Sequence, residues 1–456
     1  MITARHKTLV LVALALLAAC GSTPDSAVPH ALSTSDGSAP APTLATFATE
    51  AVDEDTAIAS AAIEALRAAG PAGLAALLEA HAAEVTTLRE APLVADRAAL
   101  DALREDPALA RLRVAIDRVA AQRDAFASGL YWYTDLAEAQ IESARTNRPI
   151  LSLRLLGRLD EEASCANSRF FRWLLYPNPA VREALAGYVL HWSSERPAPH
   201  ITIDMGDGRT IERTITGNSI HYVLDASGNV IDAIAGLHTA GDFIVRLQAA
   251  HALAERCGTR LADRACVASA HIGLSEQTRS AWQAMEGRPG IPSWEELLTR
   301  DAPVVDAPSM ELAMPITASK MFIEAPMVRM MGATPPPPAI VWDPIARLSV
   351  RATYEETISE PSRSLARLKT GRIDDAAMLV ATYERARTDT ALNRFTLERR
   401  LHAWLEDPRE PADFASINTR VYAELFLTPA SDPWLGLRSE TDWDVLEVTS
   451  SSDSEN

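Results

Sequence analysis

The feature that most constrains the fold is a series of short apolar runs between Pro149 and Ala235, separated by turn residues and helical segments. Four runs have the length and the apolar, β-branched or aromatic content of strands. They are Ile150–Leu156, Tyr188–Trp192, Ile220–Leu224 and Val230–Ala235. Helical segments at about 167–176 and 179–187 separate the first two runs, and another at about 240–255 follows the last. The order strand, helix, strand, hairpin, helix predicts an α/β domain with a mixed sheet.

Helical periodicity dominates on both sides of this domain. Apolar residues recur three and four positions apart over residues 51–128, and the same period returns beyond Asp374. The recurring positions are Leu74, Leu77, Leu78, Val85 and Leu88; Leu109, Leu112, Ile116 and Val119; Leu397, Leu401, Trp404 and Leu405; and Phe414, Ile417, Val421 and Leu425. We expect Gly70-Pro71, Pro92 and Pro107 to separate short helices in the N-terminal region.

Two stretches resemble the beginning and the end of thioredoxin-like domains. In Trp132–Ile150 a helix that ends in Arg-Pro leads into the first strand. In Val223–Gly236 a strand, an Asp-x-x-Gly turn, a second strand and a glycine precede the last helix. The resemblance covers roughly residues 130–250, under a third of the 456-residue chain. It implies an α/β thioredoxin-like domain with a mixed central sheet, flanked by α-helical N- and C-terminal regions.

The resemblance also implies a site at the start of the helix after the first strand. Thioredoxin-like enzymes carry Cys-x-x-Cys there, and the positive helix N-terminus lowers the pKa of the first thiol. The corresponding segment here is Cys165-Ala166-Asn167-Ser168, so Cys165 takes the nucleophile position and Ser168 the resolving position. A mixed disulfide formed by Cys165 must then await an external thiol. This disfavours a dithiol oxidoreductase.

Two further departures weaken the catalytic interpretation. Ser219 stands where the family has a cis-proline that helps to bind extended substrates, and a cis bond before a residue other than proline costs about 2.5–4 kcal/mol. We therefore expect the loop around Ser219 to be altered. The connection 157–164 is longer than the family's usual one and carries Asp160, Glu161 and Glu162. Acidic neighbours oppose formation of a thiolate.

Three interpretations of Cys165 remain open. It is a monothiol site assisted by the Ser168 hydroxyl, a half-buried structural cysteine under the helix start, or one half of an intermolecular disulfide. We favour a domain that has lost dithiol redox chemistry and serves as a binding or scaffold module. The alternative is an enzyme of the monothiol disulfide-exchange or isomerase type that uses Cys165.

Cys257 and Cys266 form the other cysteine pair. In one continuous helix their thiols would lie about 13 Å apart on opposite faces, too far for a disulfide. If the helix breaks at Gly258-Thr259, the two could close a small loop as a structural staple.

The N-terminus predicts export from the cytoplasm. Basic residues precede the apolar run Leu9–Ala19, which is shorter than the roughly 20 residues of a membrane-spanning helix and typical of a signal peptide, residues 1–19. The end of the run, Leu17-Ala18-Ala19-Cys20, resembles the lipobox of bacterial lipoproteins. The resemblance implies lipidation of Cys20, and Gly21 after it implies the periplasmic face of the outer membrane. An ordinary cleaved signal with a coincidental cysteine is the alternative.

Composition and charge limit the partners. The formal charge of −18 becomes −20 once Arg5 and Lys7 leave with the signal, so neither nucleic acid nor an anionic membrane is an expected electrostatic partner. The expected partners are the membrane, through lipid on Cys20, and an unidentified envelope protein.

No cofactor or metal site is expected, because the histidines of the α/β region are dispersed and lack short ligand spacings. These histidines are His191, His200, His221 and His238. The run Asp204–Gly208 is interpreted as a hairpin turn rather than a Ca²⁺ loop.

The remaining chain gives domain boundaries but no motif. The aromatic stretch Tyr422–Leu427, with Trp434 and Trp443, is interpreted as helix packing in preference to a binding surface. The predicted parts are the signal 1–19, the lipidated cysteine and flexible tether 20–48, a helical region 49–128, the thioredoxin-like domain 129–256, an irregular or helical connector 257–345, a helical region 346–448 and a disordered tail 449–456.

Overall fold

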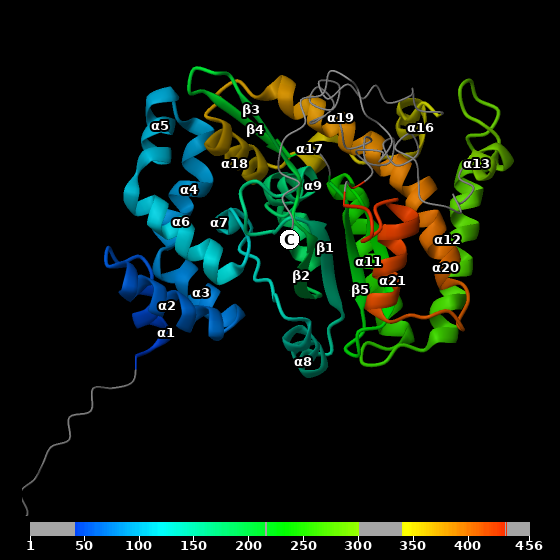
Figure 1. Cartoon of the computed structure of the whole chain (residues 1–456), viewed down its shortest axis with the longest axis horizontal. Helices are drawn as coiled ribbons and strands as arrows, with labels where there is room; N and C mark the ends of the chain where they lie inside the picture. The colour runs from blue at the N-terminus through cyan, green and yellow to red at the C-terminus, as the bar shows by residue number, and fades with distance from the viewer. Residues whose placement is uncertain (1–41, 215–216, 301–339, 434, 436–456) are drawn as a thin grey trace, which may run out of the picture. The chain divides into compact units, whose positions relative to one another are not determined.

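The computed structural model describes residues 42–214, 217–300, 340–433 and 435. A four-stranded sheet in the order β2-β1-β5-β6 lies among the helices (Figure 1). Its strands are β1 (Ile150–Leu156), β2 (Val189–Arg196), β5 (Ser219–Leu224) and β6 (Val230–Ala235). β1 runs parallel to β2 and antiparallel to β5, and β5 runs antiparallel to β6. The structure therefore confirms a mixed sheet built from the four predicted runs.

The connections explain these strand directions. A parallel pair needs a crossover, and the chain passes from β1 to β2 through α9 (Ala166–Phe170), a π-helical turn η1 (Phe171–Leu175) and α10 (Pro179–Leu185). The antiparallel pair β5–β6 is joined by a tight turn. The Asp225 carboxylate accepts hydrogen bonds from the backbone N–H groups of Ser227 and Asn229, both at 2.9 Å.

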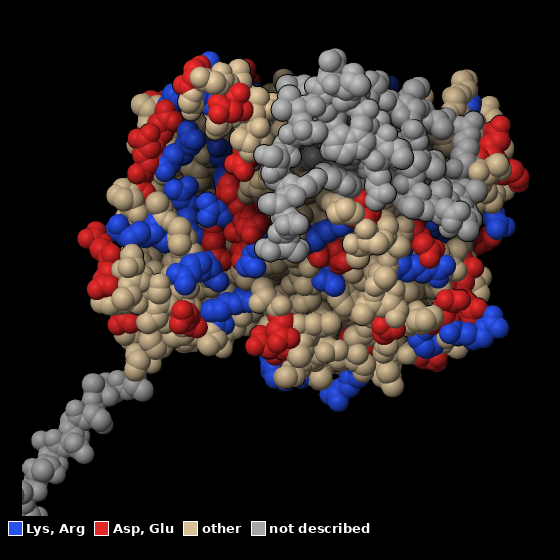
Figure 2. Space-filling view, viewed as in Figure 1, with Lys and Arg blue, Asp and Glu red and all other residues tan. Residues whose placement is uncertain are grey.

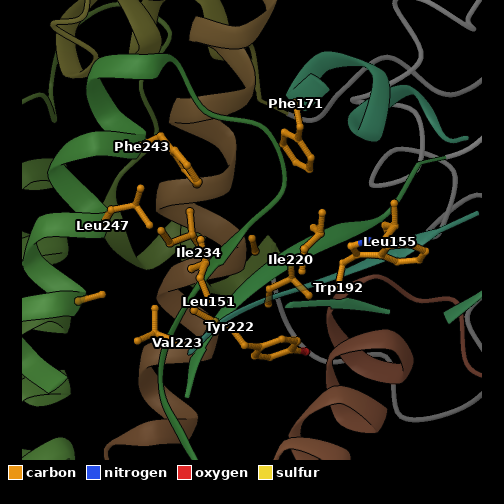
Figure 3. Close-up of a cluster of buried hydrophobic side chains, with 14 of the residues drawn as sticks. Leu151, Leu155, Phe171, Trp192, Ile220, Tyr222, Val223, Ile234, Phe243 and Leu247 are labelled. Carbon is orange, nitrogen blue, oxygen red and sulfur yellow. The ribbon is translucent and has the colours of Figure 1, made fainter. Parts of the chain in front are cut away.

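Helices cover both faces of the sheet, which is why its strands appear in the sequence as unbroken apolar runs. The covering helices are α11 (Ala240–Cys257) on one face and α21 (Phe414–Arg420) on the other. Phe243 and Leu247 of α11 lie on the side of Ile234, whereas Tyr222 lies on the side of α21 (Figure 3). There the Tyr222 ring meets Phe414 edge to face, with 5.1 Å between the centroids.

Short helices form the described N-terminal part, in agreement with the predicted periodicity. They are α1 (Leu44–Glu50), α2 (Thr56–Ala68), α3 (Pro71–Ala80), α4 (Ala82–Val94), α5 (Arg97–Glu105), α6 (Pro107–Ala120), α7 (Ala125–Ser128) and α8 (Leu136–Thr146). Pro71 and Pro107 begin helices as expected. Pro92 lies in the last turn of α4, and the break expected there falls just after it, between Val94 and Arg97. The unpredicted break between α3 and α4 falls at His81.

The described C-terminal part is also helical. Its elements are α12 (Arg264–Gln283), α13 (Trp294–Arg300), α16 (Trp342–Ser349), α17 (Tyr354–Thr357), α18 (Glu360–Thr370), α19 (Ala376–Asn393), η2 (Arg394–Glu398), α20 (Arg399–Leu405), α21 and η3 (Val421–Leu425). Leu365 and Leu368 of α18 join the core of the N-terminal helices. Tyr422 and Phe426 are buried, which confirms that this stretch packs against the protein. Trp434 and Trp443 lie outside the described residues.

The segment Asp204–Gly208 turns a separate hairpin, as predicted. Strands β3 (His200–Asp204) and β4 (Thr210–Thr214) pair with each other and form a two-stranded sheet of their own. The Asp204 carboxylate accepts a hydrogen bond from the N–H of Gly206 at 2.8 Å, so it stabilises the turn.

The surface charges of both signs lie close together. On the face shown in Figure 2, basic and acidic side chains are intermingled.

Candidate functional site

Cys165 occupies the position that the sequence assigned to it. It is the residue immediately before α9, at the end of the connection that leaves β1. Its sulfur is a thiol outside any disulfide, and the residue is 0% exposed. The structure therefore places Cys165 at the start of the helix, but in the protein interior.

The loop that carries Ser219 lies against the first turn of α9. The side-chain amide of Asn167 donates a hydrogen bond to the Ser219 hydroxyl at 2.7 Å. A Cβ atom at Gly217 would lie 3.5 Å from the backbone nitrogens of Ala166 and Asn167, so the two segments are in close contact. The structure thus brings together the segment 165–168 and the loop around Ser219.

The Ser168 hydroxyl takes part in a buried polar chain. The Ser164 hydroxyl donates to it at 2.8 Å, and the Arg172 guanidinium in turn donates to the Ser164 oxygen at 3.2 Å. Ser164, Ser168 and Arg172 are each 0% exposed. These hydrogen bonds fix the connection between β1 and α9 in one conformation.

Residues of the C-terminal part of the chain lie against the loop beside Cys165 and Ser219. The Asn218 side chain donates to the Thr428 hydroxyl at 3.2 Å, and the Tyr422 hydroxyl lies 3.5 Å from the Asn218 carbonyl. Burial raises the pKa of Tyr422 well above its usual value, and Glu195 and Cys165 add to the shift. The sequence predicted that Tyr422–Leu427 packs its helices on each other or on the α/β domain, but not which loop it contacts. This aromatic stretch was the only signal for the contact.

The acidic residues of the connection 157–164 have basic partners. Asp160 is paired with Arg158 at 2.7 Å. Glu162 is bound by Arg123 at 2.9 Å and by Lys369 at 2.6 Å. Burial opposes the charge of Glu162, but the nearby cations outweigh it and hold its pKa at about 2. These contacts compensate the acidic charge that we expected to oppose ionisation of Cys165.

Glu162 belongs to a larger ion network with three carboxylates and three cations. Its members are Asp117, Asp124, Glu162, Arg123, Arg172 and Lys369. Asp124 is bound by both Arg172 and Lys369 at 3.2 Å. The network thereby links the N-terminal helices, the residues after Cys165 and α18.

Asp117 makes the stability of this network depend on pH. Burial raises its pKa to about 7, and the nearby Asp124 adds to the shift. In the unfolded chain an aspartate titrates near pH 3.9. The folded protein therefore holds a proton that the unfolded chain has lost, so this residue's contribution to stability falls as the pH rises from about 4 through about 7.

Asp117→Asn is expected to remove this contribution. In the wild type the Ala125 N–H donates a hydrogen bond to the Asp117 carboxylate at 2.8 Å. An asparagine oxygen can still accept this bond, but the asparagine side chain cannot ionise. As the pH rises from about 4 to 8, the variant should become more stable than wild type. The difference in the free energy of unfolding should reach of order 2–4 kcal/mol at the upper end. Urea unfolding of both proteins across this range measures the difference. If the free energies of unfolding of the two proteins changed in parallel with pH, the raised pKa assigned to Asp117 would be contradicted.

Two histidines of the α/β region, His191 and His221, are buried in structural positions. His191 lies 2.8 Å from the Ser152 hydroxyl, and His221 lies 2.8 Å from the Tyr176 hydroxyl. Burial lowers the pKa of His191 to about 4, with help from Arg154, and that of His221 to about 3. The strand register puts them on opposite faces of the sheet, since His191 is opposite Ser152 and His221 opposite Leu153. They therefore do not form one site.

Cys257 and Cys266 are joined by a disulfide. α11 ends at Cys257, and Gly258 follows it with a φ of +110°. Cys266 lies in the first turn of α12, and the two Cα atoms are 5.5 Å apart. The bond thus closes a short loop between two helices.

A buried cluster that the sequence analysis did not identify lies at the outer strand β6. Asp232 of β6, His271 of α12 and His402 of α20 offer ligand atoms that all lie within 4.8 Å of one another. The local signal was weak: Asp232 is a single carboxylate in the apolar run Val230–Ala235, and the two histidines are far apart in the sequence.

The predicted signal peptide, Cys20 and the tether up to residue 41 lie outside the described residues. Within the described residues, no helix has the length and apolar character needed to cross a membrane. Comparison with known proteins gave no match to a protein-family model, to a curated protein or to a solved structure.

Proposed function

We propose that this chain is an envelope lipoprotein whose thioredoxin-like domain has lost redox activity and serves as a binding or scaffold module in the periplasm. Three features support the thioredoxin-like assignment. The sheet has the order β2-β1-β5-β6, with β1 parallel to β2 and antiparallel to β5. A helix begins directly after Cys165, and the loop 217–219 lies opposite its first turn.

The observation that carries the proposal is the complete burial of Cys165, close to Tyr422 of the chain's own C-terminal part. Thiol–disulfide exchange requires a thiolate to reach the sulfur of another molecule. Here the thiol is 0% exposed, and the loop beside it is bonded to Thr428. In addition, Ser168 supplies no second thiol. A substrate disulfide can reach the buried thiol only if the protein opens locally, so a binding role fits the geometry better than exchange.

The location rests on the lipobox-like residues Leu17–Cys20 and the apolar run before them. Acyl chains on Cys20 would attach the protein to the membrane and leave the folded part in the periplasm. A disulfide between Cys257 and Cys266 suits this oxidising compartment. The proposed partner is another envelope protein.

Alkylation of Cys165 tests the loss of redox chemistry. In the native protein, iodoacetamide should modify this thiol at least roughly a hundredfold more slowly than in the chain unfolded by guanidinium, because reaction must await local opening. Mass spectrometry of peptides measures the rate at Cys165 without reduction of the Cys257–Cys266 disulfide. A native rate close to that of the unfolded chain, or a thiol pKa well below about 8.5, would support the monothiol enzyme instead.

A matched variant calibrates this measurement. Thr86 is exposed on α4, so Thr86→Cys in a Cys165→Ser background provides a surface thiol on the same protein. It should react rapidly in the folded state. In cells, mixed-disulfide complexes should be as scarce with wild type as with Cys165→Ser. Complexes that disappear on this substitution would contradict the redox-inactive assignment.

A further inference from the structure

The cluster at β6 has the composition and arrangement of a metal site. Asp232 lies on the outer strand of the sheet, and α12 and α20 pack beside it with His271 and His402. The three residues are between 0% and 8% exposed. Three potential ligands thus converge in the interior from three separate elements.

The orientation of His271 is set by a hydrogen bond to the outer edge of the sheet. Its Nε2 lies 2.9 Å from the Ile231 carbonyl, which can only accept, so Nε2 carries the proton. Nδ1 is then an unprotonated lone-pair donor, and it has no hydrogen-bond partner among the described residues. Metal-bound histidines are commonly held in this way, by donation from the other ring nitrogen to a carbonyl or carboxylate.

His402 is likewise without a satisfactory partner. Its Nε2 lies 3.8 Å from Asp232 Oδ1, which is too long for a hydrogen bond. Its Nδ1 has no partner among the described residues, and the ring lies 5.1 Å, centroid to centroid, from that of His271. A buried polar atom without a partner costs about 1–3 kcal/mol, so a ligand that bound the unpartnered Nδ1 of His271 would remove such a cost.

A network of arginines and carboxylates lies beside the cluster. Arg246 is paired with both Asp242 and Glu398, and Arg394 interacts with the same two carboxylates. Burial raises the pKa of Asp232, and the nearby His271 and Arg246 offset part of this effect. His238 also contacts Asp242 and Glu398, at 3.0 and 3.3 Å, so these two carboxylates already have partners. A cation bound at Asp232 would stabilise the ionised form of that carboxyl.

We propose that Asp232, His271 and His402 bind a divalent transition-metal ion of the Zn²⁺ class. Two imidazole nitrogens and one carboxylate suit Zn²⁺ or Co²⁺, whereas Ca²⁺ and Mg²⁺ take oxygen ligands. Bonds of about 2.0–2.2 Å require the ligand atoms to move closer together than they now lie. The ion would join the edge strand β6 to α12 and α20, with water in the remaining position. This site is independent of Cys165.

Metal binding can be measured directly on the untagged full chain in detergent. Wild type grown with added Zn²⁺ should retain about one equivalent per chain by elemental analysis. After chelation, titration with Co²⁺ should produce visible d–d absorption bands of a site with nitrogen ligands. If wild type retains no metal and binds Co²⁺ without these bands, the proposal is overturned, whatever the variants do.

The variants identify the ligands. Asp232→Asn and His402→Gln should each lower the affinity for Co²⁺ by more than about tenfold. His251→Gln, which replaces a partly exposed histidine of α11, should retain wild-type affinity. Circular dichroism checks that each variant is folded. Folded Asp232 and His402 variants that bind metal as tightly as wild type would overturn the assignment, even if wild type contains Zn²⁺.

Discussion

Arg172→Met is expected to lower the free energy of unfolding by roughly 3–5 kcal/mol, because it removes one partner of a buried ion pair. The Arg172 side chain is 0% exposed and binds the Asp124 carboxylate at 3.2 Å. It also donates to the Ser164 hydroxyl and to the Glu162 carbonyl. Methionine fills much of the same volume but supplies no charge or donor, so Asp124 would lose one of the two cations that bind it and keep Lys369. Urea unfolding followed by circular dichroism measures the loss.

The same substitution at an exposed arginine provides the control. The Arg145 side chain is 70% exposed and pairs with Glu142 three residues earlier on α8. Arg145→Met should change stability by no more than about 1 kcal/mol, because water screens exposed ion pairs. Equal losses in the two variants would mean that burial of Arg172 has no special energetic role. A folded Arg172→Met variant should also expose Cys165 to faster alkylation, since this network fixes the segment before it.

Local patterns were enough to predict the strands of the sheet. Val230–Ala235 is an apolar run bounded by a turn, and a strand buried on both faces produces that pattern without reference to the rest of the chain. The same holds for Ile150–Leu156, whose bounds agree with β1. The start of the helix at Cys165 followed from the resemblance, which depends on the order of local elements.

Contacts between distant segments could not be predicted in this way. Asn218 and Thr428 are separated by 210 positions, and no periodicity in either segment identifies the other as its partner. The loop beside Cys165 could therefore be located from the sequence, but its contact with Thr428 could not. Asp232, His271 and His402 were missed for the same reason, because three separate elements bring them together.

Pro92 differs from these cases because its position depends on local structure. The helix tolerates this proline in its last turn, two residues before α4 ends.

Gly73→Ala tests a close contact between helices that sequence propensity would misjudge. On helix propensity alone, alanine should stabilise α3 by about 1 kcal/mol. However, a Cβ at position 73 would lie 1.9 Å from the Leu66 carbonyl oxygen of α2. The atom in the way is backbone, so α2 and α3 must separate and disturb the buried contacts of Leu66 and Leu77. We expect a loss of roughly 2–4 kcal/mol, measured by urea unfolding.

A second glycine separates the clash from the intrinsic effect of the substitution. Gly273 is exposed within α12, and a Cβ there would meet no atom within 4 Å. Gly273→Ala should therefore raise the free energy of unfolding by about 0.5–1 kcal/mol. The two substitutions are chemically identical and both lie inside helices, so opposite signs can arise only from what surrounds the new methyl group. If both variants are stabilised, α2 and α3 do not pack as closely at Gly73 as described.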